Sequence, residues 1–200
     1  MLGVADRHML GTLAVHKMAG FLELLLGTQS ARASWRSMKA TTLLVRQHRN
    51  LRQLCETVEG GSAKVRASLL PQLAGDLVAH MTVETQVFYP AASAALREDW
   101  MQSTKLRHTR TMESLERVLD APVDGEEFAH AIGELRSLME LHMAEEENGL
   151  FARIEHALDS VETRTLALSI MSLYHSEVET GYRGHSENPR VHRIGHAPLP

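Results

Sequence analysis

Two segments of the sequence carry the same pair of residues at the same spacing. AHMTVETQVFYP contains His80 and Glu84, and LHMAEEENGLF contains His142 and Glu146. In an α-helix, residues four apart lie on one face, about one turn from each other. Each segment therefore directs an imidazole nitrogen and a carboxylate oxygen to one side, and these ligand types suit iron, manganese or zinc.

Four helical stretches are expected to position these pairs. From Met38 onward, turn-like clusters separate the stretches at 59–62, 97–100, 120–127 and around 160. Counted in steps of three and four, the apolar face of each stretch includes one histidine, in the order His48, His80, His108 and His142. The second and fourth stretches add Glu84 and Glu146 on the same face. The pattern predicts that four histidines and two glutamates converge in the core of a bundle.

The sequence also carries signals for helix ends. Asp124 and Glu127 have the spacing of a capping box, which predicts the start of the fourth helix. Pro71 and Pro90 lie within the second stretch, where a proline removes a backbone hydrogen bond. We therefore expect the second helix to be shortened or bent.

A bound metal accounts best for six polar residues on apolar faces. One histidine in such a place is commonly a hydrogen-bonded core residue, but a buried carboxylate without a partner is costly. The free-energy cost of burying six such residues without partners would exceed the ~5–15 kcal/mol by which a domain is stable. Apart from Lys105, no Lys or Arg is counted on the apolar faces beside them, so salt bridges do not explain the set. Six ligands favour two ions with vacant coordination positions over one closed structural zinc site.

The composition narrows the class of protein. Apolar residues make up 44% of the 200 residues, enough for a core, while aromatic residues make up only 4%, which favours helices over sheets. An all-α protein with an up-down four-helix bundle is therefore predicted. The net charge of −4, without long blocks of one sign, argues against nucleic acid as a partner. The single cysteine, Cys55, fits a reducing compartment, and we expect a cytoplasmic protein.

The chain is expected to have three parts. Residues 1–37 form an N-terminal extension, for which a helix is one interpretation; its apolar run is interrupted by Glu23 and is too short to span a membrane. Residues 38–157 form the bundle. Residues 158–200 contain a fifth helix, which covers the bundle or joins a protein partner or a second copy, followed by a polar tail. Tyr174 and His175 are interpreted as residues outside the site, since His175 lies off the main apolar stripe, and Tyr89 is interpreted as packing rather than chemistry.

The ordered set His, His-x3-Glu, His, His-x3-Glu across four helices resembles the hemerythrin-like HHE cation-binding family. The motifs are LLVRQHRNL, LVAHMTVETQVFYPAA, RHTRTMESL and LMELHMAEEENGLF, within about residues 38–157. The resemblance implies a four-helix bundle with a non-haem di-iron centre of two iron ions. The implied ligands are His48 and His80 for one iron, His108 and His142 for the other, and Glu84 and Glu146 as bridges.

Two departures from the oxygen-carrying members of that family shape the expected function. Where the carriers have a further histidine and an aspartate, this chain has Met112 and Glu147. Methionine is a poor ligand for oxidised iron, so one metal should have a more open coordination sphere than a carrier uses. Glu145 is interpreted as a solvated residue, with ligation as the alternative, and Glu147 is expected outside the ligand set.

The expected function is the binding of a small diatomic ligand or peroxide. We expect a sensor or scavenger of oxygen, nitric oxide or peroxide, because an open iron position favours sensing or redox chemistry over reversible carriage. The alternatives are a catalase-like, peroxidase-like or oxidase-like di-iron enzyme, and an iron-responsive metal-binding switch. No general acid or base stands out beside the six ligands, which favours binding over catalysis.

Overall fold

The computed structural model describes residues 39–93 and 98–180. The chain divides into two compact units, Met1–Lys39 and Ala40–Pro200, and every helix described below belongs to the second. The predicted N-terminal extension and polar tail lie outside the described residues, and the domain limits stay predictions. Helices are present and no strand occurs in the described ranges, so the all-α class is confirmed. None of these helices is long and apolar enough to cross a membrane.

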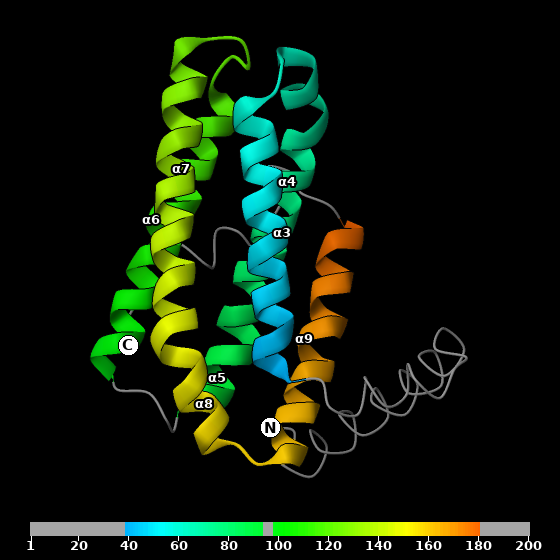
Figure 1. The fold of residues 1–200 in the computed structure, drawn as a ribbon, viewed down its shortest axis with the longest axis vertical. Helices are drawn as coiled ribbons and strands as arrows, with labels where there is room; N and C mark the ends of the chain where they lie inside the picture. Colours follow the sequence, from blue (N-terminus) through cyan, green and yellow to red (C-terminus); the bar gives the residue numbers. More distant parts are fainter. Residues whose placement is uncertain (1–38, 94–97, 181–200) are drawn as a thin grey trace, which may run out of the picture. The chain divides into compact units, whose positions relative to one another are not determined.

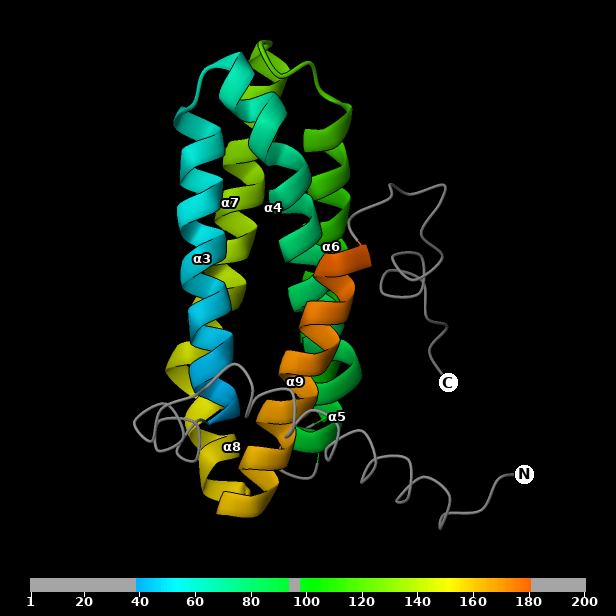
Figure 2. The same ribbon diagram turned by 90° about the vertical axis from the view of Figure 1, so that its right-hand side faces the viewer.

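Four long helices form an up-down bundle (Figures 1 and 2). They are α3 (Ala40–Gly60), α4 (Ala63–Val83), α6 (Glu98–Asp120) and α7 (Glu126–Glu145). Short turns join α3 to α4 and α6 to α7, so the helices of each pair run in opposite directions. α3 packs on α4 and α7, and α7 packs on α6. This arrangement lets one face of each helix contribute to a shared core.

Two of these helices continue beyond their α-helical ends. α4 is followed by the π-helix η1 (Glu84–Phe88) and the short helix α5 (Tyr89–Ala92), and α7 is followed by η3 (Glu146–Leu150) and α8 (Phe151–Ala157). A fifth long helix, α9 (Ser160–Thr180), packs on α3 and α4 (Figure 2). The apolar residues that α9 buries are Leu166, Ala167 and Ile170. A protein partner or second copy bound through α9 stays a prediction.

The apolar core has two parts, and the buried histidines lie between them. One cluster includes Leu51, Leu77 and Met139, and the other includes Leu44, Val83 and Leu150. Along α3, His48 falls between Leu44 of one cluster and Leu51 of the other, and it is fully buried. The two apolar clusters therefore lie on either side of the buried histidines and shield them from water.

The capping-box prediction for the fourth helix is wrong. α7 begins at Glu126 with Gly125 as its N-cap, and no side chain caps it. The Gly125 N–H donates to the Pro122 carbonyl at 2.8 Å, which closes a turn and places Asp124 inside that turn instead of at the cap. Pro71 does not shorten α4, which continues to Val83, and a bend in this helix stays a prediction. Because Pro71 lies on the exposed side of the helix, the carbonyl that loses its helical donor is accessible to solvent.

Candidate metal centre

All six residues predicted to bind metal lie buried in the bundle. Their exposed fractions are at most 2%, and they are His48, His80, Glu84, His108, His142 and Glu146. Five of them, all except His108, offer ligand atoms that lie within 4.8 Å of one another. His108 reaches the same group through Glu84, because His108 Nε2 lies 3.2 Å from Glu84 Oε2. The bundle thus brings all six side chains to one place, and their role as ligands stays a prediction.

The two carboxylate oxygens of Glu84 face different histidines. Oε1 lies 3.0 Å from His80 Nε2 and 3.6 Å from His48 Nε2. Oε2 lies 3.1 Å from His142 Nε2 and 3.2 Å from His108 Nε2. Glu84 therefore sits between two histidine pairs, as a carboxylate that bridges two ions must do. The pairs are the same as those that the resemblance implies.

Glu146 also faces one histidine of each pair, but through a single oxygen. Its Oε2 lies 3.3 Å from His48 Nε2 and 3.6 Å from His142 Nε2. Its Oε1 is engaged separately by the hydroxyl of Tyr89. Glu84 thus approaches all four histidines through two oxygens, whereas Glu146 approaches two of them through one.

Four buried ligand-type atoms in the centre have no hydrogen-bond partner: His48 Nε2, His80 Nε2, Glu84 Oε1 and Glu146 Oε2. They approach one another to between 3.0 and 3.6 Å without the angles of hydrogen bonds. Unsatisfied buried polar atoms are costly, so four that point at one another require an explanation. A cation bound by nitrogen and oxygen donors would satisfy them, and the residues present therefore fit a metal ion.

The electrostatics of the centre agree with this fit. Burial and the neighbouring Glu84 carboxylate raise the pKa of Glu146. Burial also opposes the ionisation of Glu84, yet the surrounding histidines, led by His80, hold its pKa well below the usual range. Burial opposes a charged His48, but the Glu146 and Glu84 carboxylates raise the pKa of His48 to about 10. Two buried carboxylates thus lie among four imidazoles, a donor set whose negative charge a cation would compensate.

Each of the two glutamates begins a π-helix, a rare element that is frequent at functional sites. The Tyr89 N–H donates to the Glu84 carbonyl, and the Phe151 N–H donates to the Glu146 carbonyl, both across five residues. This wider turn places the fifth residue after each glutamate near the centre. Accordingly, the Phe151 ring stacks on His48 with centroids 5.7 Å apart, and the Tyr89 ring lies 5.5 Å from that of His108.

Tyr89 packs in the apolar cluster as predicted, and its hydroxyl also reaches the centre, which the sequence interpretation missed. Its hydroxyl donates to Glu146 Oε1 at 2.7 Å and lies 3.2 Å from both Glu84 Oε2 and His108 Nε2. Burial, followed by the Glu146 and Glu84 carboxylates, raises the pKa of Tyr89 well above its usual range. The phenol therefore stays protonated and donates. An available signal was the aromatic residue five positions after each glutamate, Tyr89 and Phe151.

Three other residues considered from the sequence lie outside the centre. The Glu145 side chain is 40% exposed and pairs with Arg107 at 2.8 Å, so it is not a ligand in this arrangement. Tyr174 packs against the apolar cluster under α9. His175 forms an exposed pair with Glu179 on the solvent side of α9. The interpretations of Tyr174 and His175 as residues outside the site are confirmed.

Outer contacts orient two of the histidines. Glu147 Oε1 lies 2.7 Å from His48 Nδ1, the ring nitrogen that faces away from the centre. His80 Nδ1 lies 2.9 Å from Gln47 Oε1 in the same way. Such contacts fix the ring and leave Nε2 directed at the site where a metal would bind. Glu147 therefore lies outside the cluster of six but touches one of its members.

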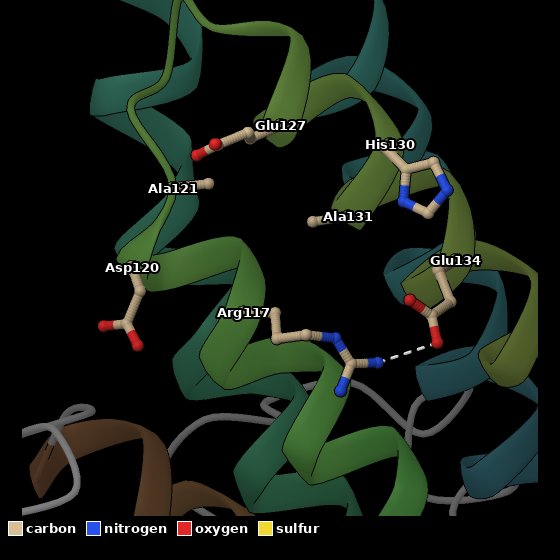
Figure 3. A pocket seen from close by; sticks show the side chains of 7 residues that line it. All are labelled: Arg117, Asp120, Ala121, Glu127, His130, Ala131 and Glu134. Carbon is tan, nitrogen blue, oxygen red and sulfur yellow. Dashed lines mark hydrogen bonds and ion pairs between the residues drawn. The ribbon is translucent and has the colours of Figure 1, made fainter.

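A separate surface pocket lies between the end of α6 and the start of α7 (Figure 3). Its lining residues are Arg117, Asp120, Ala121, Glu127, His130, Ala131 and Glu134. Arg117 donates to Glu134 at 2.7 Å, and both side chains are more than 40% exposed. The polar groups of this pocket are solvated, so the pocket does not share the chemistry of the buried centre.

A helical bundle with histidines and glutamates converging in its core has the architecture of a cation-binding protein. The chain belongs to the family described as the hemerythrin HHE cation binding domain, whose model matches residues 39–154. The implied fold and family are thereby confirmed.

A solved structure supports the same fold. The chain resembles a hemerythrin HHE cation binding domain-containing protein from Mycobacterium kansasii, a Rv2633c homolog, with a TM-score of 0.64 and 17% identity. The match covers 80% of this chain and 96% of that protein. No curated protein sequence matches the chain at a significant level.

Proposed function

We propose that this chain is a non-haem di-iron protein that binds oxygen, nitric oxide or peroxide and acts as a sensor or scavenger. The observation that carries the proposal is the position of Glu84, whose two oxygens face two different histidine pairs. A carboxylate that faces two histidine pairs can be shared by two ions, and two ions that share carboxylates would use all six residues. Iron, when bound, supplies the redox chemistry.

The residues of the chain would hold the ions and control their surroundings. Leu77, Met112 and Met139 are buried and lie one helical turn from a histidine, where they limit the entry of water. Tyr89 donates to Glu146 Oε1 and fixes the orientation of that carboxylate. Because Met112 is apolar, the histidine pair of α6 and α7 gains no third nitrogen from this position. This argument favours an open position for a small ligand.

A peroxide-consuming enzyme is the second candidate function, and Tyr89 is the observation that favours it. The protonated Tyr89 hydroxyl lies 3.2 Å from Glu84 Oε2 and from His108 Nε2. This hydroxyl carries a proton beside the candidate ligands, and the sequence pattern did not reveal that position. Such a group could donate a hydrogen bond to peroxide at the centre.

Anaerobic loading of the purified protein with ferrous iron tests both functions. We expect about two irons per chain, because six ligands are arranged around a bridging carboxylate. Oxygen, nitric oxide and peroxide are then added in turn while the visible spectrum is recorded. An irreversible change with oxygen supports sensing or scavenging, sustained loss of peroxide supports the enzyme, and a reversible change with oxygen would indicate carriage instead. One iron per chain at full occupancy would contradict the bridged centre.

Replacing the Tyr89 hydroxyl separates its role from that of the ligands. Tyr89→Phe should retain about two irons, since the hydroxyl donates to Glu146 rather than occupying a ligand position. If Tyr89 assists peroxide consumption, the rate should fall by about 10²-fold or more, the size typical of a lost proton donor. Tyr174→Phe is the matched control, because it removes a hydroxyl from the apolar cluster under α9. Equal rates in both variants would argue against the second candidate function.

A further inference from the structure

The centre is built from two matching halves. In one half, His48 of α3 contacts residues that follow Glu146; in the other, His108 of α6 contacts residues that follow Glu84. In both halves the residue directly after the glutamate reaches the Nδ1 atom of the histidine. In both, the fifth residue after the glutamate places an aromatic ring beside the same histidine. The correspondence follows from the two π-helices, which begin at equivalent positions.

The two halves differ in the group that contacts Nδ1. Glu147, a carboxylate, lies 2.7 Å from His48 Nδ1. Thr85, a neutral hydroxyl, lies 3.3 Å from His108 Nδ1. Arg52 donates to the same Glu147 oxygen at 2.9 Å and holds the carboxylate in place. The contact to His48 is therefore shorter, charged and supported by a second residue.

Within residues 39–93 and 98–180, the supporting hydrogen bonds continue to the surface in the half that contains His48. Arg52, four residues after His48, also donates from Nε to Glu140 Oε2 at 2.9 Å. The Arg52 and Glu140 side chains are 26% and 47% exposed. A series of polar contacts through Arg52 thus holds the ring of His48. At the equivalent position after His108, Met112 packs in the apolar core.

We infer that Glu147 makes the two metal positions unequal, so that the position formed by His48 and His80 binds its ion more tightly and fills first. The inference rests on the proposed function, in which the cluster holds two metals, and adds the order of loading and the residue that sets it. A carboxylate on the outer nitrogen of a ligating histidine fixes the ring and strengthens it as a ligand. His80 is also pre-oriented, because its Nδ1 lies 2.9 Å from Gln47 Oε1. Glu147 acts through His48 and is a positioning residue.

Cobalt(II) titration of the metal-free protein against a competing chelator tests the inference, because cobalt absorption reports both occupancy and ligand geometry. The wild-type protein should fill in two steps whose affinities differ by about tenfold or more. Glu147→Thr provides His48 with the same kind of partner that His108 has. The first step should weaken by about 10–100-fold, so that the two steps merge. Glu147→Gln, which keeps an acceptor without the charge, should fall between wild type and Glu147→Thr.

Glu145→Gln is the matched control for this titration. It removes the same charge two positions earlier in the chain, from a carboxylate that pairs with Arg107 and not with a histidine. Its two steps should match those of the wild-type protein. The absorption bands of the first cobalt bound should shift in both Glu147 variants and stay unchanged in Glu145→Gln. A role of Glu147 in helix stability alone would not produce that spectral difference.

Each result of the cobalt titrations either supports or overturns the inference about Glu147. Two equal steps in the wild-type protein, or an unchanged titration of Glu147→Thr, would overturn the inference and leave the metal centre intact. An equal loss in Glu145→Gln would also overturn it, because the effect would then be one of general charge. No cobalt uptake by the wild-type protein would overturn the proposed centre and the inference together. If circular dichroism shows that Glu147→Thr does not fold, the decision passes to Glu147→Gln.

Discussion

Replacing Glu84 by alanine is expected to remove both metal ions from the centre. Unlike Glu146, Glu84 directs its two oxygens at different histidine pairs, at 3.0 Å from His80 and 3.1 Å from His142. Its loss would deprive each ion of a charged ligand and would leave the positive charges of the two ions without their shared bridge. We expect iron content to fall from about two per chain to near zero, measured by elemental analysis after anaerobic loading and gel filtration.

Two comparison variants give this experiment its specificity. His48→Ala removes one terminal nitrogen, so it should keep about one iron, held by the other histidine pair and the carboxylates. Glu145→Ala removes an exposed glutamate that pairs with Arg107, and it should keep both irons. All three variants should remain helical by circular dichroism. Retention of one tightly bound iron in Glu84→Ala would show that Glu84 is a terminal ligand and not a bridge.

Metal loading is expected to raise the thermal stability of the protein substantially. Without a cation, the bundle must bury Glu84 and Glu146 at no more than 1% exposure, close to each other. An ion that binds only the folded state stabilises it by about 4 kcal/mol when its free concentration is 1,000 times Kd. For a protein of this size, about 1 kcal/mol shifts Tm by about 2–4 °C, so one ion should raise Tm by about 10 °C.

Differential scanning calorimetry of metal-free and loaded protein would measure this difference. Glu84→Ala serves as the control, because a variant that does not bind metal should melt at the same temperature with and without added iron. A wild-type protein whose Tm is insensitive to iron would contradict the assignment of the six residues to a metal centre. A similar rise in the Glu84→Ala variant would place the stabilising ion elsewhere on the molecule.

Local spacing was sufficient to identify the two His-x3-Glu pairs. His80 and Glu84, like His142 and Glu146, lie one helical turn apart, and that geometry depends only on backbone hydrogen bonds within one helix. The single histidines His48 and His108 could be recognised as polar residues on otherwise apolar faces. The all-α class followed from composition and periodicity for the same reason, since both reflect local preferences.

The helix ends and the roles of adjacent residues were less predictable. Asp124 and Glu127 satisfied the capping pattern, but a turn closed by the Gly125 N–H moved the start of α7 beyond Asp124. Glu145 and Glu147 flank Glu146 and are chemically identical to it. Their side chains make different contacts because their neighbours on other helices differ: Arg107 for Glu145, and His48 with Arg52 for Glu147.

Local patterns in the sequence predicted the long helices, the side chains that share a face and the order of the six candidate ligands. The tertiary structure decided the contacts between helices, including that of His48 with Glu147 across 99 residues of sequence. It also decided that the helix widens to a π turn at each glutamate, which directs Tyr89 into the centre. Helical periodicity arises from hydrogen bonds between near neighbours, and the sequence therefore records it directly. A widened turn and the facing of two helices depend on packing energies summed over the whole bundle, and no single segment contains that information.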